Sequence, residues 1–123
     1  MKTFIGIAVL SFAALGLGCS SSNTATYSCN FPTGIGYCYE WTATPPLTTD
    51  QINALQVSCT SAAIGSGTFS NGGSCSSTNR VGLCTLSYPS AGVTYQWFLY
   101  SPAFNANTGQ TACTSSGGTW TAG

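Results

Sequence analysis

Seven cysteines in 123 residues constrain this chain more than any other feature. Six of them, at positions 29, 38, 59, 75, 84 and 113, follow an apolar N-terminal stretch. An even set of cysteines in an exported chain predicts three disulfide bonds formed in an oxidising compartment. A zinc site is the alternative, but zinc sites generally use closely spaced pairs such as Cys-x-x-Cys. Cys29 with Cys38 and Cys75 with Cys84, the nearest pairs, do not fit that pattern, so neither a metal nor another cofactor is predicted.

The first 18 residues have the plan of a secretory signal. Lys2 gives one positive charge, the stretch from Phe4 to Leu17 is apolar, and Gly18 ends it. A helix over this apolar stretch would extend only about 21 Å, short of the ~30 Å hydrocarbon core of a bilayer. We therefore predict a signal peptide over 1–18, a flexible polar tether over 19–26 and a single folded domain over 27–123.

Charge is almost absent from the part that follows the signal. Glu40, Asp50 and Arg80 are its only charged side chains, and the chain has no histidine. Nucleic-acid binding needs clustered Lys and Arg to displace counterions from phosphates, so a nucleic-acid partner is not expected. Acid-base and nucleophilic catalysis need a His, a Lys or paired carboxylates, so we do not expect an enzyme and predict no catalytic residues.

Two halves of the predicted domain resemble each other in sequence. Tyr-Glu-Trp at 39–41 corresponds to Tyr-Gln-Trp at 95–97, and Cys-Thr-Ser at 59–61 corresponds to Cys-Thr-Ser at 113–115. Upstream cysteines precede both Tyr-x-Trp motifs at nearly equal spacing. These landmarks predict an internal duplication with half-repeats over 27–70 and 82–123, joined by a loop over 70–80.

Each half predicts the order strand, strand, helix, strand. The stretches 37–44 and 93–100 are rich in aromatic and β-branched residues, as strands are, and 80–88 is predicted to form a hairpin with the second. Thr48 and Gln51 fit a capping box that opens the first helix, whereas the second helix is predicted to open at Ser101 and Pro102. Two such units imply a small disulfide-rich α+β domain, with an antiparallel sheet and both helices on one side.

The duplication also restricts the 15 ways of pairing six cysteines. Equivalent pairs would be Cys29 with Cys59 and Cys84 with Cys113, which leaves Cys38 to pair with Cys75. The main alternative joins near neighbours, Cys29 with Cys38 and Cys59 with Cys75. Cys19 has no partner in the first scheme.

Aromatic side chains are the remaining candidates for function. Tyr37, Tyr39 and Trp41 alternate along a strand and must share one face of the sheet. That face is either core beneath the helices or an aromatic surface that binds a sugar or a protein. The possible binding residues are Trp41, Trp97, Tyr100 and Trp120. Glu40 occupies the position of Gln96 in the other half, which indicates a hydrogen-bonding group, or it forms a salt bridge with Arg80.

The stretch LGLGCSSS at 15–22 resembles the lipobox of bacterial lipoproteins. In that family the signal is cut just before a cysteine, which carries a diacylglyceryl thioether and an N-linked acyl chain such as palmitate. Gly16 stands where Leu is typical, and Leu17 where a small residue is typical. The resemblance implies lipidation of Cys19, and Ser20 after it is similar to lipoproteins sent to the outer membrane of Gram-negative bacteria. The rest of the chain is similar to small cysteine-rich lipoproteins of such bacteria.

These observations together predict a non-enzymatic protein tethered by lipid on Cys19 to the outer membrane or cell surface. Its role would be structural, or the binding of an envelope protein. The alternatives are a carbohydrate-binding module that uses Tyr and Trp, with an envelope glycan as partner, and a secreted inhibitor that presents the loop 70–80.

Overall fold

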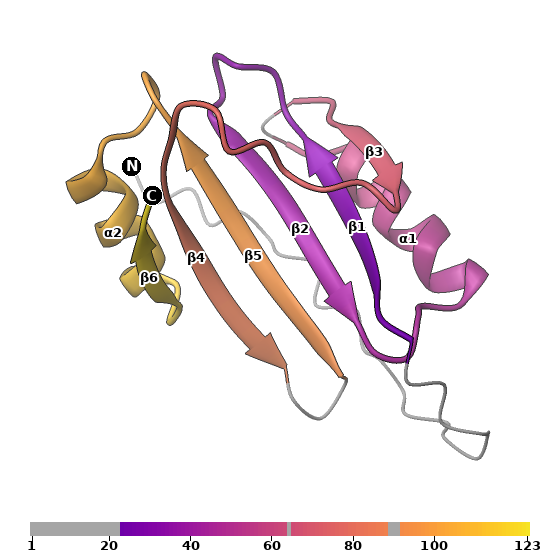
Figure 1. Ribbon diagram of the computed structural model, residues 1–123. Helices are drawn as coiled ribbons and strands as arrows, with labels where there is room; N and C mark the ends of the chain where they lie inside the picture. Colours follow the sequence, from indigo (N-terminus) through magenta and orange to yellow (C-terminus); the bar gives the residue numbers. More distant parts are fainter. Residues whose placement is uncertain (1–22, 64, 89–91) are drawn as a thin grey trace.

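The computed structural model describes residues 23–63, 65–88 and 92–123 (Figure 1). The elements in chain order are β1 (Ala25–Asn30), β2 (Tyr37–Ala43), α1 (Thr49–Thr60), β3 (Thr68–Asn71), β4 (Arg80–Tyr88), β5 (Val93–Tyr100), α2 (Ala106–Ser115) and β6 (Thr119–Ala122). The predicted signal peptide 1–18 and the tether residues 19–22, Cys19 included, lie outside the described residues. Ala25 and Thr26, which were expected in the tether, already pair with β2.

All six strands form one antiparallel sheet in the order β3-β1-β2-β5-β4-β6. This order places β2 and β5, the two Tyr-x-Trp strands, side by side at the centre. The predicted hairpin between 80–88 and 93–100 is confirmed by the pairing of β4 with β5. From either edge the strands follow the same order. A short strand (β3 or β6) comes first, a longer strand (β1 or β4) comes next, and a Tyr-x-Trp strand (β2 or β5) comes third.

The two helices lie on the same face of the sheet, as expected. One cross-strand row on this face consists of Cys29, Tyr39, Trp97, Cys84 and Trp120. Cys29 is bonded to Cys59 of α1, and Cys84 is bonded to Cys113 of α2. Because both disulfides start from one row, both helices are held to one face, which we call the helix face. In Figure 1, α1 lies behind β1 and β3 at one end, and α2 lies at the other end with β6.

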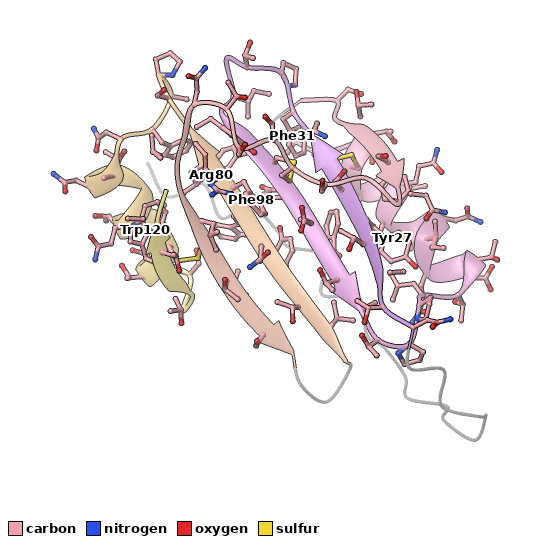
Figure 2. All side chains as sticks on the ribbon, in the orientation of Figure 1. Tyr27, Phe31, Arg80, Phe98 and Trp120 are labelled. Carbon is pink, nitrogen blue, oxygen red and sulfur yellow. A yellow bond between two sulfur atoms is a disulfide. The ribbon has the colours of Figure 1, made fainter. Side chains whose placement is uncertain are left out.

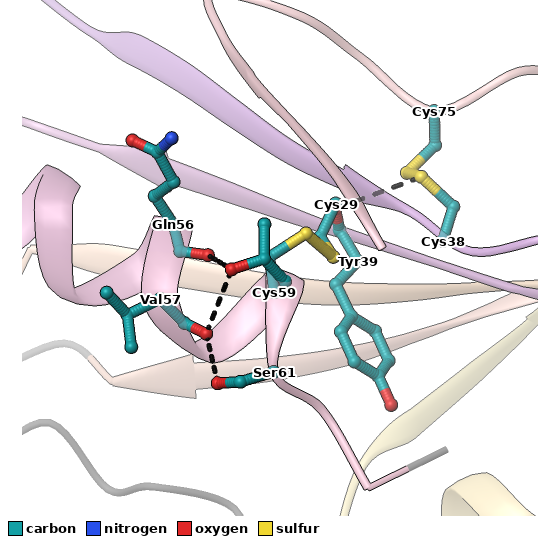
Figure 3. The surroundings of a disulfide bond; sticks show 9 residues. Cys29, Cys38, Tyr39, Gln56, Val57, Cys59, Ser61 and Cys75 are labelled. Atoms are coloured by element: carbon teal, nitrogen blue, oxygen red, sulfur yellow. Dashed lines mark hydrogen bonds between the residues drawn. A yellow bond between two sulfur atoms is a disulfide. The ribbon is translucent and has the colours of Figure 1, made fainter. Parts of the chain in front are cut away.

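The opposite face is crossed by residues 72–79, the connection between β3 and β4, which we call the strap (Figure 1). The third disulfide, Cys38–Cys75, holds the strap to β2. The three disulfides are therefore the three pairs that were predicted from the spacing of the cysteines. Figure 3 shows Cys29–Cys59 beside α1 and the neighbouring Cys38–Cys75.

Local sequence explains where each helix begins. Thr48 accepts a hydrogen bond from the Gln51 N–H, and the Gln51 side chain accepts one from the Thr48 N–H, which confirms the predicted capping box of α1. The predicted start of α2 at Ser101 and Pro102 is wrong. Asn105 and Thr108 form a second capping box, so the helix begins at Ala106. In this capping box the Asn105 side chain accepts from the Thr108 N–H and the Thr108 hydroxyl accepts from the Asn105 N–H, so two backbone N–H groups are satisfied at the start of α2.

The core lies between the sheet and the helices. One cluster gathers Tyr27, Ala43, Leu55 and Val93, and a second gathers Cys29, Phe31 and Cys59. Tyr27 is only 2% exposed, and its hydroxyl accepts a hydrogen bond from the Leu47 N–H at 3.1 Å. The α1 positions Leu55 and Cys59 are buried, as their helical spacing predicts.

Candidate functional site

Five aromatic rings lie together on the helix face of the two central strands. Tyr37, Tyr39 and Trp41 come from β2, and Tyr95 and Trp97 come from β5. Strand alternation places them on one face, and the antiparallel register sets Tyr39 opposite Trp97 and Trp41 opposite Tyr95. We call these five residues the aromatic cluster.

Tyr39 is the centre of the aromatic cluster. Its ring centroid lies 6.1 Å from Tyr37, 6.2 Å from Trp41, 5.6 Å from Tyr95 and 6.2 Å from Trp97. Aromatic pairs at these separations attract each other through their ring quadrupoles, beyond the effect of area burial. The cluster is therefore a connected set of rings that crosses the boundary between the two halves of the chain.

Two further rings close the cluster at one end. Phe31, just after β1, meets Tyr39 edge to face at 5.3 Å, and Phe104, just before α2, meets Tyr37 at 4.8 Å. Neither residue was singled out from the sequence. Both lie in connections outside the strands and helices, where no regular spacing of apolar residues predicts which side chains join a cluster.

Four of the five rings in the cluster are only partly covered. Tyr95 is buried, whereas Tyr37, Tyr39, Trp41 and Trp97 are half-buried. Burial, with a smaller contribution from Tyr37, raises the pKa of Tyr39 to about 12. Burial also raises the pKa of Tyr37. Both hydroxyls therefore stay protonated at neutral pH and can donate hydrogen bonds.

The four predicted binding residues separate into different places. Trp41 and Trp97 belong to the aromatic cluster. Trp120 is on the same face but packs beside α2, where its ring lies against Gly82 and Gly109 (Figure 2). Tyr100 is on the opposite face, and its hydroxyl donates a hydrogen bond to the Ser76 carbonyl of the strap at 2.7 Å. The structure thus brings two of the four together.

The strap face holds Glu40 and Gln96, which are direct cross-strand partners. Glu40 Oε2 accepts a hydrogen bond from the Cys75 N–H at 2.9 Å, and Gln96 Nε2 donates one to Thr85 Oγ1 at 3.2 Å. Both act as hydrogen-bonding groups, as their equivalent positions indicated.

Arg80 does not form the alternative salt bridge with Glu40 in the described part of the chain. Its guanidinium lies 5.6 Å from the centroid of the Phe98 ring instead (Figure 2). Within residues 23–63, 65–88 and 92–123, no three His, Cys, Asp or Glu side chains gather as a metal ion would require. In the same residues, no helix is long and apolar enough to cross a membrane.

Comparisons with known proteins give no match. No family model matches the chain, and no curated protein or solved structure shows significant similarity to it.

Proposed function

We propose that this protein is a lipid-anchored, non-enzymatic binding module of the bacterial envelope, and that it binds an envelope protein through the aromatic cluster. The main support for this binding site is that four Tyr and Trp rings contact one another over the central strands and are partly exposed. Aromatic side chains supply much of the energy at protein interfaces. Partly exposed apolar side chains that form one contiguous patch on a small domain commonly mark an interaction surface.

The lipid anchor is proposed from the lipobox-like stretch alone. Lipid on Cys19 would hold the domain at the outer membrane or cell surface, and the six remaining cysteines would form the three disulfides. A duplicated origin of the two halves is part of the proposal. It is supported by the strand order, which reads alike from either edge, and by the equivalent disulfides that join β1 to α1 and β4 to α2.

A non-enzymatic role is supported by the positions of the few charged groups. Glu40 accepts a hydrogen bond from the backbone N–H of Cys75 in the strap. Asp50 lies in the first turn of α1, where the helix dipole favours a negative charge. Neither carboxylate lies in the aromatic cluster.

The anchor is tested by the intact mass of detergent-extracted protein, with and without reduction. The expected mass is that of residues 19–123 with a diacylglyceryl group and an N-linked acyl chain on Cys19, and it is six hydrogens lower before reduction than after it. A mass with unmodified Cys19 would overturn the anchor.

The binding surface is tested by photo-crosslinking in intact cells. A benzophenone amino acid at position 37, in the aromatic cluster, is expected to capture a discrete envelope protein. The same group at position 100, on the strap face, is the control. Equal capture from both positions, or none from position 37, would contradict the proposed surface.

A further inference from the structure

The three disulfides differ in how well their cysteines are covered. The two disulfides that hold α1 and α2 are formed by cysteines that are at most 2% exposed. In the third, Cys38 is buried at 1% exposure, whereas Cys75 on the strap is half-buried (Figure 3). A thiolate must reach a sulfur atom directly to exchange with a disulfide, so exposed disulfides exchange most readily. Cys75 is therefore the cysteine that an outside thiol reaches most easily.

The disulfides on the helix face are also enclosed by neighbouring backbone. A Cβ on Gly67 would lie 2.5 Å from Cys29 Sγ and 2.9 Å from Cys59 Sγ. A Cβ on Gly118 would lie 3.0 Å from Cys113 Sγ. Because not even a methyl group fits beside these sulfur atoms, an attacking thiol would first have to displace the chain segments around them.

The strap has few bonds to the sheet besides its disulfide. Its residues are exposed, apart from Gly73 and Cys75, which are half-buried. Within the described part of the chain, two hydrogen bonds join the middle of the strap to the sheet. The Cys75 N–H donates to Glu40, and the Tyr100 hydroxyl donates to the Ser76 carbonyl. Exposed segments with few bonds open locally at a low free energy, so the disulfide is the main constraint on this segment.

Two residues on the strap face are buried although both helices lie on the other face. Ser28 is 0% exposed, and a Cβ on Gly73 would lie 3.0 Å from its Oγ, so the strap covers this serine directly. Phe98 is 6% exposed and is the cross-strand partner of Cys38, which the disulfide joins to the strap. The strap therefore shields a serine and lies beside a buried apolar ring.

Ser28 also opposes the closed position of the strap. Its Oγ is buried and has no hydrogen-bond partner among the described residues. A buried hydroxyl without a partner destabilises the closed state, because water can bond to it once the strap moves away. The Cys38–Cys75 bond thus holds in place a segment that its other contacts hold weakly.

We propose that Cys38–Cys75 is a redox switch, which a thiol reductant opens to free the strap and uncover the strap face around Ser28 and Phe98. Thiol–disulfide changes commonly act as switches where they release a segment of this kind. The aromatic cluster on the other face takes no part in the switch. The inference therefore goes beyond the proposed function and does not depend on it.

The reductant is a dithiol or two molecules of a small thiol. Its thiolate attacks Cys75 Sγ, the bond between the two cysteines breaks, and Cys38 leaves as a thiolate that takes up a proton. A second thiolate of the reductant attacks the mixed disulfide and frees the Cys75 thiol. The reductant is left as a disulfide, so two electrons and two protons pass from it to the protein.

The first test measures which disulfide opens first. Detergent-extracted protein with its three disulfides is incubated in glutathione buffers of increasing reduced-to-oxidised ratio. Samples taken over time are alkylated, and peptide mapping identifies the labelled cysteines. We expect Cys38 and Cys75 to be labelled about tenfold or more faster than the cysteines of the other two disulfides. Near-UV circular dichroism should stay native meanwhile, because α1 and α2 remain bonded to the sheet.

The second test measures release of the strap by hydrogen exchange. Amide exchange over 73–77 is expected to be about tenfold faster in the selectively reduced protein than in the oxidised protein, with α1 and α2 unchanged. Cys38→Ala combined with Cys75→Ala should show the same faster exchange. Cys84→Ala combined with Cys113→Ala is the matched control, because it removes a disulfide of the helix face and should leave 73–77 unchanged. Thermal melts establish that each double variant is folded.

Opening of all three disulfides at one rate, or earlier labelling of Cys29 or Cys84, would overturn the proposal. Strap amides that stay protected in the reduced wild-type protein would overturn it as well, and this measurement needs no variant. Capture of an envelope protein from position 37 is a separate result. A failed switch is therefore distinguishable from a failed proposed function.

Discussion

Trp41 and Tyr95 stack across the boundary between β2 and β5, with ring centroids 5.3 Å apart and planes inclined by 14°. They are direct cross-strand partners in the sheet, and each belongs to a Tyr-x-Trp motif in a different half of the chain. The contact therefore joins the two halves through side chains as well as through strand pairing.

The stacking should be measurable as a coupling energy. Trp41→Ala, Tyr95→Ala and the double variant form a mutant cycle, and the coupling is expected to be about 0.5–1.5 kcal/mol, as for other aromatic pairs. Urea unfolding of the four proteins gives the free energies. Additive losses would show that the two rings stabilise the domain independently.

The three disulfide pairs can be tested chemically. Non-reduced peptide mapping should recover Cys29 linked to Cys59, Cys84 to Cys113 and Cys38 to Cys75. Removing the strap disulfide with Cys38→Ala and Cys75→Ala together should cost about 2–4 kcal/mol, since it closes a long loop. A peptide that joins Cys29 to Cys38 would contradict the whole scheme.

Two glycines pack against the disulfides that join β1 to α1 and β4 to α2, and they should resist substitution. A Cβ on Gly67 would lie 2.5 Å from Cys29 Sγ, and one on Gly118 would collide with Cys84 Sγ. Because disulfide atoms have little freedom to move, Gly67→Ala and Gly118→Ala should each destabilise by about 1–3 kcal/mol. Gly34→Ala is the control, because nothing lies within 4 Å of its Cβ position. Thermal unfolding of the three variants distinguishes these cases.

Much of this fold could be predicted from the sequence, for identifiable reasons. Period-two alternation set Tyr37, Tyr39 and Trp41 on one face, and the Thr48 capping box marked the start of α1. Spacing between the halves restricted the cysteine pairs. Each of these signals is a local pattern or a spacing along the chain, so a single sequence contains it.

Other features depend on contacts between distant segments, which one sequence does not reveal. The contacts of Phe31 and Phe104 with the cluster arise from connections without periodicity. The start of α2 was misplaced because Pro102 matched one helix-start signal while Asn105 and Thr108 formed a better cap. The path of the strap, where the Ser76 carbonyl accepts a hydrogen bond from the Tyr100 hydroxyl, likewise could not be predicted from composition.

Ionisation of Tyr39 should couple to folding at high pH. The pKa of this hydroxyl is raised to about 12, above the ordinary value of 10, because burial disfavours the phenolate. The folded state holds this proton more tightly than the unfolded chain does. The resulting stability is therefore complete below about pH 10 and is lost as the pH rises toward 12. Urea unfolding from about pH 9 upward should show the decline, and Tyr39→Phe should show a smaller one. Equal slopes for both proteins would exclude Tyr39 as the source.

Glu40 is expected to act as a hydrogen-bond acceptor for the strap and not as a proton carrier. Glu40→Gln keeps an oxygen that can accept from the Cys75 N–H, as the amide of Gln96 would at the equivalent position, so its stability should change little. Glu40→Ala leaves that N–H without its acceptor and should cost about 1–3 kcal/mol. Hydrogen exchange at the Cys75 amide reports the local effect, because protection should persist in Glu40→Gln and fall in Glu40→Ala. Loss of protection in both variants would show that the negative charge, and not the hydrogen bond, holds the strap.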